Sequence, residues 1–198
     1  MDSQADNAPP SRREAMKLMS VAIGGAVAGV GGSMLVGRID RAPPGGWHFY
    51  TPEEARLVEA LSEQIIPADQ DPGAKDAGVV YFIDRQLTGP YQRYQDQYRA
   101  GLASVAETSR RMFGKDFLAL AWNEQTKLLV AMDSGRAPKQ CWPSVAAAEF
   151  FRLIRDHTMQ GFYGSPRHGG NRGYASFKML GLEYPVVMGQ NRYPKAKG

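Results

Sequence analysis

Side chains suited to acid–base, nucleophilic or metal chemistry are few in this sequence of 198 residues, which has three histidines and one cysteine. His48, His157 and His168 stand far apart, and none has a second ligand at the spacing of a known metal motif. Ser165 is not a typical nucleophile, because it precedes a proline and lacks the G-x-S-x-G setting of a nucleophile elbow. We therefore expect no catalytic residue and no metal site in this chain.

The single cysteine, Cys141, limits the redox chemistry available to the chain. It excludes an intramolecular disulfide, a multi-cysteine zinc site and an iron–sulfur cluster held by this chain alone. Its surroundings are not those of a papain-like nucleophile, and it lies in a connector between Pro138 and Pro143. An odd thiol in an exported protein either stays buried or pairs with another chain, and both alternatives remain open for Cys141.

Carboxylates and glycine motifs do not indicate a cofactor either. Asp69, Asp71, Asp76 and Asp84 could suggest calcium, but the EF-hand pattern is missing and solvated turns explain the first three. The sequence has no G-x-G-x-x-G after a strand, no G-x-x-x-x-G-K-[ST] and no H-E-x-x-H. We expect the chain to carry no cofactor of its own.

The segment 161–174, called here the glycine-rich segment, has the most unusual composition in the chain. It packs five glycines, three aromatic residues and three basic residues into fourteen positions. This composition predicts a long loop without regular structure, and the aromatic residues argue against disorder. His168, between Arg167 and Arg172, is the best candidate for contact with another molecule. The alternative is a structural role, in which Phe162 and Tyr163 pin a glycine-dense turn.

The elements that position these residues are predicted to be helices, because no segment alternates apolar and polar residues for long. Thr51 begins the first helix as its N-cap, followed by a proline and a capping-box glutamate, and Pro67 ends it. The second is expected from Asp76, as its cap, through Leu87. Pro90 should begin the third, which ends near Gly114.

Three further helices complete the prediction. One begins at Asn123 as N-cap and ends at Ser134-Gly135, one begins at Pro143-Ser144, and a short one covers residues 175–180. His157 should lie at the end of its helix, where a protonated imidazole would favour the negative pole. The tyrosines of the third helix should form a core edge with their hydroxyls at the surface; they are Tyr91, Tyr94 and Tyr98.

Together these elements predict an all-α protein, an irregular helical domain of about five to seven helices over residues 47–198, with a long glycine-rich loop near the C-terminus. Its composition, 43% hydrophobic and 22% charged, is that of a globular chain with one core. The net charge of +4 is small and there is no run of lysines and arginines. The chain therefore lacks the electrostatic signature of nucleic-acid binding.

The first 40 residues have the composition of an export signal, and residues 41–46 that of a linker. Arg12, Arg13 and Lys17 precede an uncharged stretch, residues 18–36, that is rich in glycine and alanine. Weak hydrophobicity behind paired arginines resembles the twin-arginine signal, although Ala15 stands where that pattern has an aromatic residue. This resemblance implies export of a folded protein to the periplasm. An uncleaved membrane anchor is the alternative.

Three groups of residues carry a more specific resemblance. They are residues 65–69 with 72–74 and 77–79, residues 81–84, and residues 157–164 with 169–172. In these stretches the sequence resembles the gluconate 2-dehydrogenase subunit 3 family, and the similarity extends from Trp47 to about Tyr184. Ser165 and Phe177 depart from the pattern, which commonly has an acidic residue and a tryptophan at these positions.

The resemblance implies a non-catalytic small subunit that stabilises a large flavoprotein of the glucose–methanol–choline oxidoreductase type and supplies its export signal. The large subunit would hold FAD, oxidise a sugar, sugar acid or related glucoside or polyol, and pass electrons to a cytochrome c or a quinone. The complex would be a heterodimer, or a heterotrimer with a cytochrome c, and the twin-arginine translocase would be a transient partner.

Two sets of contacts with the large subunit are expected on this basis. The alternatives for Cys141 then become a disulfide to the large subunit or a buried thiol. The partner-binding residues are expected in the glycine-rich segment; they are Phe162, Tyr163, Arg167, His168, Asn171 and Arg172.

An independent periplasmic sugar-binding protein or enzyme remains the alternative function.

Overall fold

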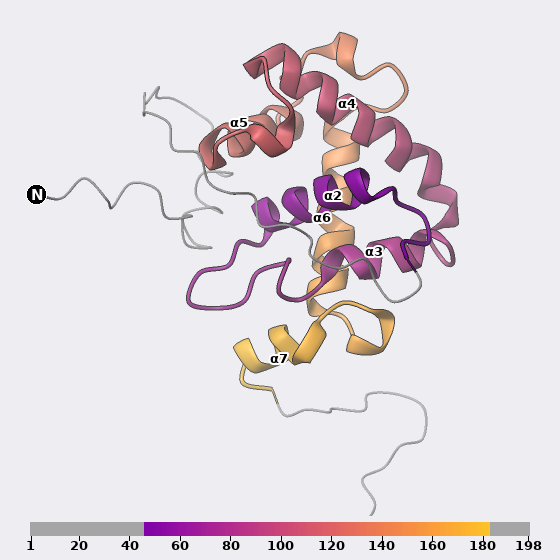
Figure 1. Cartoon of the computed structure of the whole chain (residues 1–198), viewed down its shortest axis with the longest axis vertical. Helices are drawn as coiled ribbons and strands as arrows, with labels where there is room; N and C mark the ends of the chain where they lie inside the picture. The colour runs from indigo at the N-terminus through magenta and orange to yellow at the C-terminus, as the bar shows by residue number, and fades with distance from the viewer. Residues whose placement is uncertain (1–45, 183–198) are drawn as a thin grey trace, which may run out of the picture.

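The computed structural model describes residues 46–182, and this part of the chain is built from helices alone (Figure 1). The prediction of an all-α fold is confirmed. The six described α-helices are α2 (Pro52–Ile65), α3 (Val79–Leu87), α4 (Gln95–Phe113), α5 (Trp122–Asp133), α6 (Ala147–Tyr163) and α7 (Ala175–Met179). Short 3-10 helices connect several of them; they are η1 (Gln92–Tyr94), η2 (Phe117–Ala119), η3 (Lys139–Cys141), η4 (Pro166–His168) and η5 (Arg172–Tyr174).

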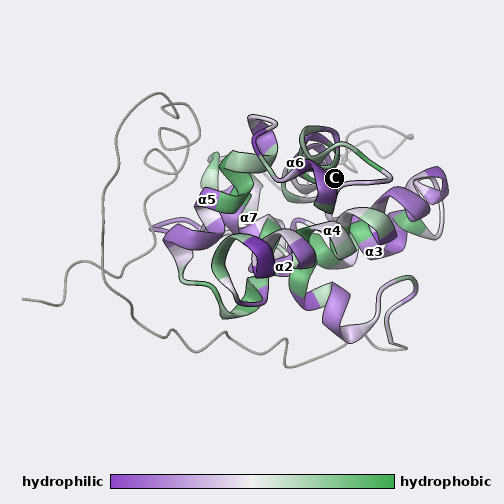
Figure 2. Cartoon of the chain, turned by 90° about the horizontal axis from the view of Figure 1, so that it is seen from above, coloured by the Kyte–Doolittle hydropathy of each residue, from purple (hydrophilic) through white to green (hydrophobic). Residues whose placement is uncertain are grey.

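Helix α6 is the central element, and α2, α3, α4, α5 and α7 all pack against it. Figure 1 shows it running through the domain, with α5 near one end and α7 at the other. The helices are amphipathic, and the colours of Figure 2 change accordingly between hydrophobic and hydrophilic along each ribbon. Phe150 and Ile154 of α6 are buried in the continuous core. Gly101 of α4 permits this packing, because a Cβ there would lie 2.3 Å from the Phe150 ring.

Helix α2 forms as its sequence predicts. The Thr51 hydroxyl accepts a hydrogen bond from the Glu54 N–H at 3.2 Å, and the Glu54 carboxylate accepts one from the Thr51 N–H at 2.8 Å. This reciprocal capping box, with Pro52 in the first helical position, fixes the start of the helix.

The predicted starts of the other long helices are wrong. Helix α3 begins at Val79 after Gly78, whose φ of +66° is left-handed, and Asp76 instead accepts a hydrogen bond from the Gly73 N–H. Helix α4 begins at Gln95, because the chain after Pro90 first forms the 3-10 turn η1. Asn123 lies inside α5, and α6 begins at Ala147 rather than at Pro143-Ser144.

The glycine-rich segment is more regular than its composition predicts. Its first three residues complete the last turn of α6, and η4 and η5 occupy much of the remainder. Within residues 46–182, no helix is long and apolar enough to cross a membrane. The predicted export signal (1–40), with Arg12, Arg13 and Lys17, lies outside the described residues, as does the chain after Leu182.

Candidate functional site

His157 is surrounded by the three tyrosines that were expected at a core edge. Its Nδ1 lies 3.0 Å from the hydroxyl of Tyr98, within hydrogen-bond distance. The Tyr91 ring stacks on the imidazole with 4.2 Å between centroids, and Tyr94 meets it edge-on at 5.3 Å. Tyr98 is fully buried and His157 is 4% exposed. The expectation of a surface hydroxyl is therefore wrong for Tyr98.

Burial keeps the His157 imidazole neutral. Loss of hydration lowers the pKa of His157 to about 4, Asp156 opposes this shift, and the nearby charge of Arg93 adds to it. The residue lies well inside α6, which continues to Tyr163, so the expected protonated histidine at a helix end is wrong. His157 joins α6 to α4 through Tyr98, and its role in the described domain is structural.

We expect a specific pH dependence from this histidine. The unfolded chain, with an ordinary pKa of 6.5, binds a proton that the folded chain takes up only near pH 4. Stability should therefore be fully present above pH 6.5 and fall as the pH drops toward 4, by at most ~1.4 kcal/mol per pH unit from this group. Imidazole NMR signals measure the titration directly. A midpoint near the ordinary value in the folded protein would refute the assignment, and His157→Gln should flatten this part of the stability profile.

The glycine-rich segment turns back on α6 at very short distance. A Cβ on Gly170 would lie 2.1 Å from the carbonyl oxygen of Gly161, so the two backbones pack directly against each other. Asn171, with a φ of +45°, holds the turn: its amide nitrogen donates to the Gly164 carbonyl at 2.9 Å, and its oxygen accepts the Ser176 N–H at 2.9 Å. Asparagine tolerates this left-handed conformation better than most residues.

Two of the predicted partner-binding residues lie inside the domain. Phe162 is fully buried, and so is Asn171. Neither side chain is exposed in this conformation, and a partner-contact role for these two residues stays a prediction that their burial does not support. The other four predicted residues, Tyr163, Arg167, His168 and Arg172, are exposed, and their contact with a partner stays a prediction.

Arg172 attaches the glycine-rich segment to α3. Its guanidinium lies over the Tyr81 ring, 3.5 Å from the centroid. The backbone N–H of Arg172 donates to the Ala77 carbonyl at 3.0 Å. Gly78 makes room for it, since a Cβ there would lie 2.5 Å from Cδ of Arg172. The Tyr81 ring also stacks on Trp47 at 5.1 Å. The residues of the motif identified in the sequence therefore serve largely to hold α6, α3 and the glycine-rich segment together.

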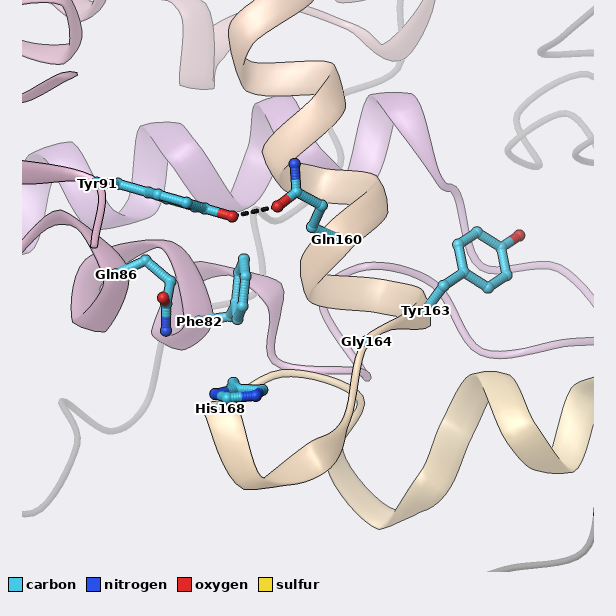
Figure 3. A pocket seen from close by; sticks show the side chains of 7 residues that line it. All are labelled: Phe82, Gln86, Tyr91, Gln160, Tyr163, Gly164 and His168. Carbon is cyan, nitrogen blue, oxygen red and sulfur yellow. Dashed lines mark hydrogen bonds between the residues drawn. The ribbon is translucent and has the colours of Figure 1, made fainter. Parts of the chain in front are cut away.

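A shallow groove of about 340 Å³ lies where these elements meet (Figure 3). Figure 3 shows the Phe82 and Tyr91 rings and the His168 imidazole around its opening, with Tyr163 turned outward. The Tyr91 hydroxyl donates to the Gln160 side-chain oxygen, and Arg167 Nε donates to His168 Nε2 at 3.0 Å. Its lining residues are Phe82, Gln86, Tyr91, Gln160, Tyr163, Gly164 and His168. We call this surface the α3–α6 groove.

Sequence reasoning missed most of this groove. Phe82, Gln86 and Tyr91 are far from residues 160–168 in the chain, and no spacing rule connects them. Their proximity comes from the packing of α3 against α6 and η4. Gln160 belongs to the recognised motif, but its residue type alone does not show that its side chain lines a groove.

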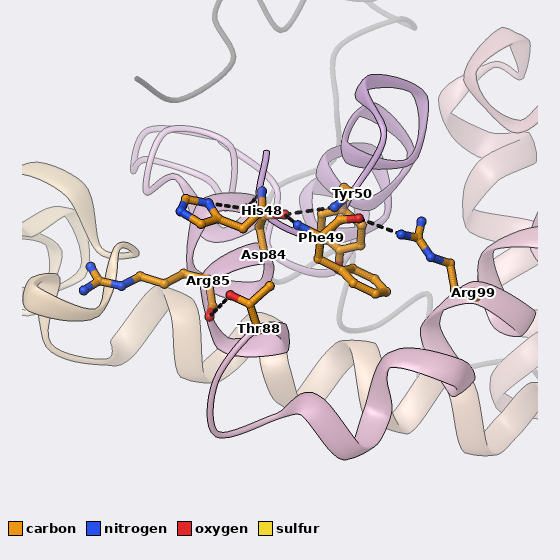
Figure 4. Close-up of polar contacts among 7 residues, drawn as sticks. All are labelled: His48, Phe49, Tyr50, Asp84, Arg85, Thr88 and Arg99. Carbon is orange, nitrogen blue, oxygen red and sulfur yellow. Dashed lines mark hydrogen bonds and ion pairs between the residues drawn. The ribbon is translucent and has the colours of Figure 1, made fainter. Parts of the chain in front are cut away.

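Asp84 was considered only as a possible calcium ligand, and the structure gives it another role (Figure 4). Its side chain is 2% exposed and accepts hydrogen bonds from the N–H groups of His48 at 2.9 Å, Phe49 at 3.0 Å and Tyr50 at 3.0 Å. His48 Nδ1 lies 3.3 Å from the same Asp84 carboxylate. Arg99 supports the same segment by donating to the Phe49 carbonyl at 2.6 Å and pairing with Glu54. The carboxylate therefore fastens the start of the described chain to α3.

The remaining candidates are Cys141 and the side chains that could hold a metal. Cys141 is a free thiol, 4% exposed, in η3, so pairing with another chain would require this turn to open. Of the two alternatives for Cys141, this placement favours the buried thiol. Within residues 46–182, no three histidine, cysteine or carboxylate side chains are grouped as metal ligands.

Comparison with known proteins extends the resemblance seen in the sequence. A family model described as gluconate 2-dehydrogenase subunit 3 matches residues 52–183, which is nearly all of the helical domain. Neither a curated protein nor a solved structure matches the chain. The match includes α3, α6 and the glycine-rich segment, whose mutual packing explains the residues of the recognised motif. The chain belongs to the gluconate 2-dehydrogenase subunit 3 family.

Proposed function

We propose that this chain is the non-catalytic small subunit of a dehydrogenase complex, and that it binds and stabilises a flavoprotein large subunit of the glucose–methanol–choline type. The observation that carries the proposal is the family match over residues 52–183. The large subunit holds the FAD and oxidises a sugar, sugar acid or glucoside. A cytochrome c, as a third subunit, or a quinone accepts the electrons.

The groove and its surroundings support a binding role. It is open and shallow, and two of the exposed residues that were expected to contact a partner, Tyr163 and His168, line it. Its aromatic rings and planar polar groups are of the kinds that recur at protein interfaces, where tyrosine and arginine are enriched.

We further propose that the N-terminal residues 1–40 direct export of the assembled complex through the twin-arginine translocase to the periplasm. Folded cargo crosses the membrane by this route, so a signal on one subunit can serve a second subunit bound to it. Arg12, Arg13 and Lys17 would form the recognised part of that signal.

One experiment tests both parts of the proposal. The tagged chain, captured from a periplasmic fraction, should bring with it a flavin-bearing subunit and its dehydrogenase activity. Replacing Arg12 and Arg13 by Lys should leave both subunits and the activity in the cytoplasm, because the proposed signal depends on the arginine pair. The matched control is Arg41→Lys, in the linker, which should have no effect. Undiminished periplasmic activity in the double variant would refute the export role.

A further inference from the structure

The α3–α6 groove is bordered by basic side chains. Residues 157–182 contain three lysines and arginines and no aspartate or glutamate. On the α3 side, Arg85 and Arg93 are exposed; Asp84, next to Arg85, is buried and occupied by backbone N–H groups, whereas Asp96, three residues after Arg93, is exposed. The side of the groove formed by residues 157–182 is therefore positively charged, although residues 46–182 as a whole are nearly neutral.

Two arginines adjoin residues that line the groove. Arg167 contacts the lining residue His168, and Arg93 follows the lining residue Tyr91 by two positions, with its guanidinium 4.6 Å from the Tyr94 ring centroid. Burial and the neighbouring Tyr94 raise the pKa of Tyr91, and the charge of Arg93 opposes that shift. Among the described residues, neither Arg93 nor Arg167 forms an ion pair.

Four of the other arginines of the described domain are neutralised locally. Arg56, Arg99, Arg110 and Arg155 each pair with a carboxylate of the described chain. A guanidinium that lacks such a partner presents a planar, bidentate donor suited to a carboxylate on another molecule. Arg93 is two residues from Tyr91 and Arg167 contacts His168, and Figure 3 shows Tyr91 and His168 on opposite sides of the Phe82 ring.

Between the two arginines the groove offers apolar area. The rings of Phe82 and Tyr91 line it, and Met159 and Tyr163 on the same end of α6 are 38% and 37% exposed. An apolar side chain that enters the groove would cover these rings, while the Gln86 amide offers hydrogen bonds at the edge. Arginine and tyrosine side chains of this kind supply much of the binding energy at protein interfaces.

We propose that the α3–α6 groove docks an acidic segment of the flavoprotein large subunit, whose carboxylates pair with Arg93 and Arg167 while an apolar side chain packs on Phe82 and Tyr91. This inference rests on the proposed function and adds the chemistry of the contact. Complementary charge brings the two chains together quickly and fixes their orientation, and the apolar contact slows dissociation.

Carbodiimide cross-linking of the purified complex tests the contact, because this reagent joins an amine directly to a carboxylate. Arg93→Lys and Arg167→Lys keep the positive charge and place an amine at the groove. We expect each variant to cross-link to an aspartate or glutamate of the FAD-bearing subunit, identified by mass spectrometry of the joined peptides. Arg136→Lys, beyond α5, is the matched control and should give no such product.

Two other kinds of product from the introduced lysines would contradict the docking proposal. A cross-link to Glu183 or to the C-terminal carboxylate of the same chain would show that the chain's own tail occupies the groove. A cross-link to a second copy would assign the groove to self-association. If the complex contains the FAD subunit but neither introduced lysine gives a product, the docking proposal is wrong and the proposed function is unaffected. If no FAD-bearing subunit accompanies the chain, both proposals fail.

Charge reversal gives an independent measure. The double variant Arg93→Glu/Arg167→Glu should retain at least about tenfold less of the large subunit at low salt, since like charges then face each other across the contact. Both side chains are exposed, so the helical circular dichroism should not change. Arg136→Glu should retain the partner as well as the unaltered chain does. Equal retention by the double variant and this control would overturn the proposal.

Discussion

Asp84→Ala is expected to lower the free energy of unfolding by about 3 kcal/mol, because it removes the only carboxylate that accepts the N–H groups of His48, Phe49 and Tyr50 among the described residues. Each buried donor left without an acceptor costs on the order of 1–3 kcal/mol. Tyr50 belongs to the hydrophobic core, so the segment cannot leave α3 without exposing its ring.

Urea unfolding followed by circular dichroism measures this loss. Asp133→Ala is the matched control, since Asp133 is an exposed carboxylate at the end of α5 and its removal should change stability by less than about 0.5 kcal/mol. Asp84→Asn should fall between the two, because the amide keeps one acceptor oxygen and turns an N–H group toward a donor. A loss below about 1 kcal/mol for Asp84→Ala would contradict the role assigned to this carboxylate.

Gly170→Ala is the second substitution for which a large effect is expected. The added Cβ would meet the Gly161 carbonyl at 2.1 Å, and this oxygen belongs to the backbone of α6, which cannot yield as a side chain would. Overpacking of this kind costs ~1–3 kcal/mol, and we expect a value near the upper end. For a domain of this size the melting temperature should fall by roughly 6–12 °C.

The control for this substitution is Gly89→Ala. A Cβ at Gly89 would have its nearest neighbour at 3.7 Å, an ordinary contact, and the position is exposed. Its melting temperature should stay close to that of the unaltered protein. If Gly170→Ala melts with the control, the close approach of the glycine-rich segment to α6 is not present in solution.

The accuracy of the sequence-based prediction depended on whether a feature is encoded locally. Helix α2 carries its whole specification in neighbouring residues: a capping box, a proline at its first position and Pro67 beyond its end. The start of α3 depends instead on the left-handed backbone of Gly78, which makes room for Arg172 from a distant part of the chain. A glycine in a sequence indicates that a left-handed conformation is possible, but it does not show that the fold requires this conformation at that position.

The candidate site shows the same division. Composition identified the glycine-rich segment as important, but it could not tell that Phe162 and Asn171 point inward while Arg167 and His168 remain at the surface. The sequence did contain one sign of the role of Asp84, which is a carboxylate among the apolar residues of a predicted helix. A carboxylate buried in this way usually has hydrogen-bond partners. The groove itself arises from tertiary packing alone and could not be predicted.

The central claim is that the redox cofactor belongs to a partner and not to this chain. It is tested most directly by the absorbance spectrum of the affinity-purified complex, recorded before and after the two subunits are separated under conditions that retain bound flavin. We expect a flavin spectrum in the complex and in the large subunit, and a colourless small subunit that oxidises no sugar with a dye acceptor. A flavin spectrum or sugar oxidation from the separated small subunit would contradict the claim.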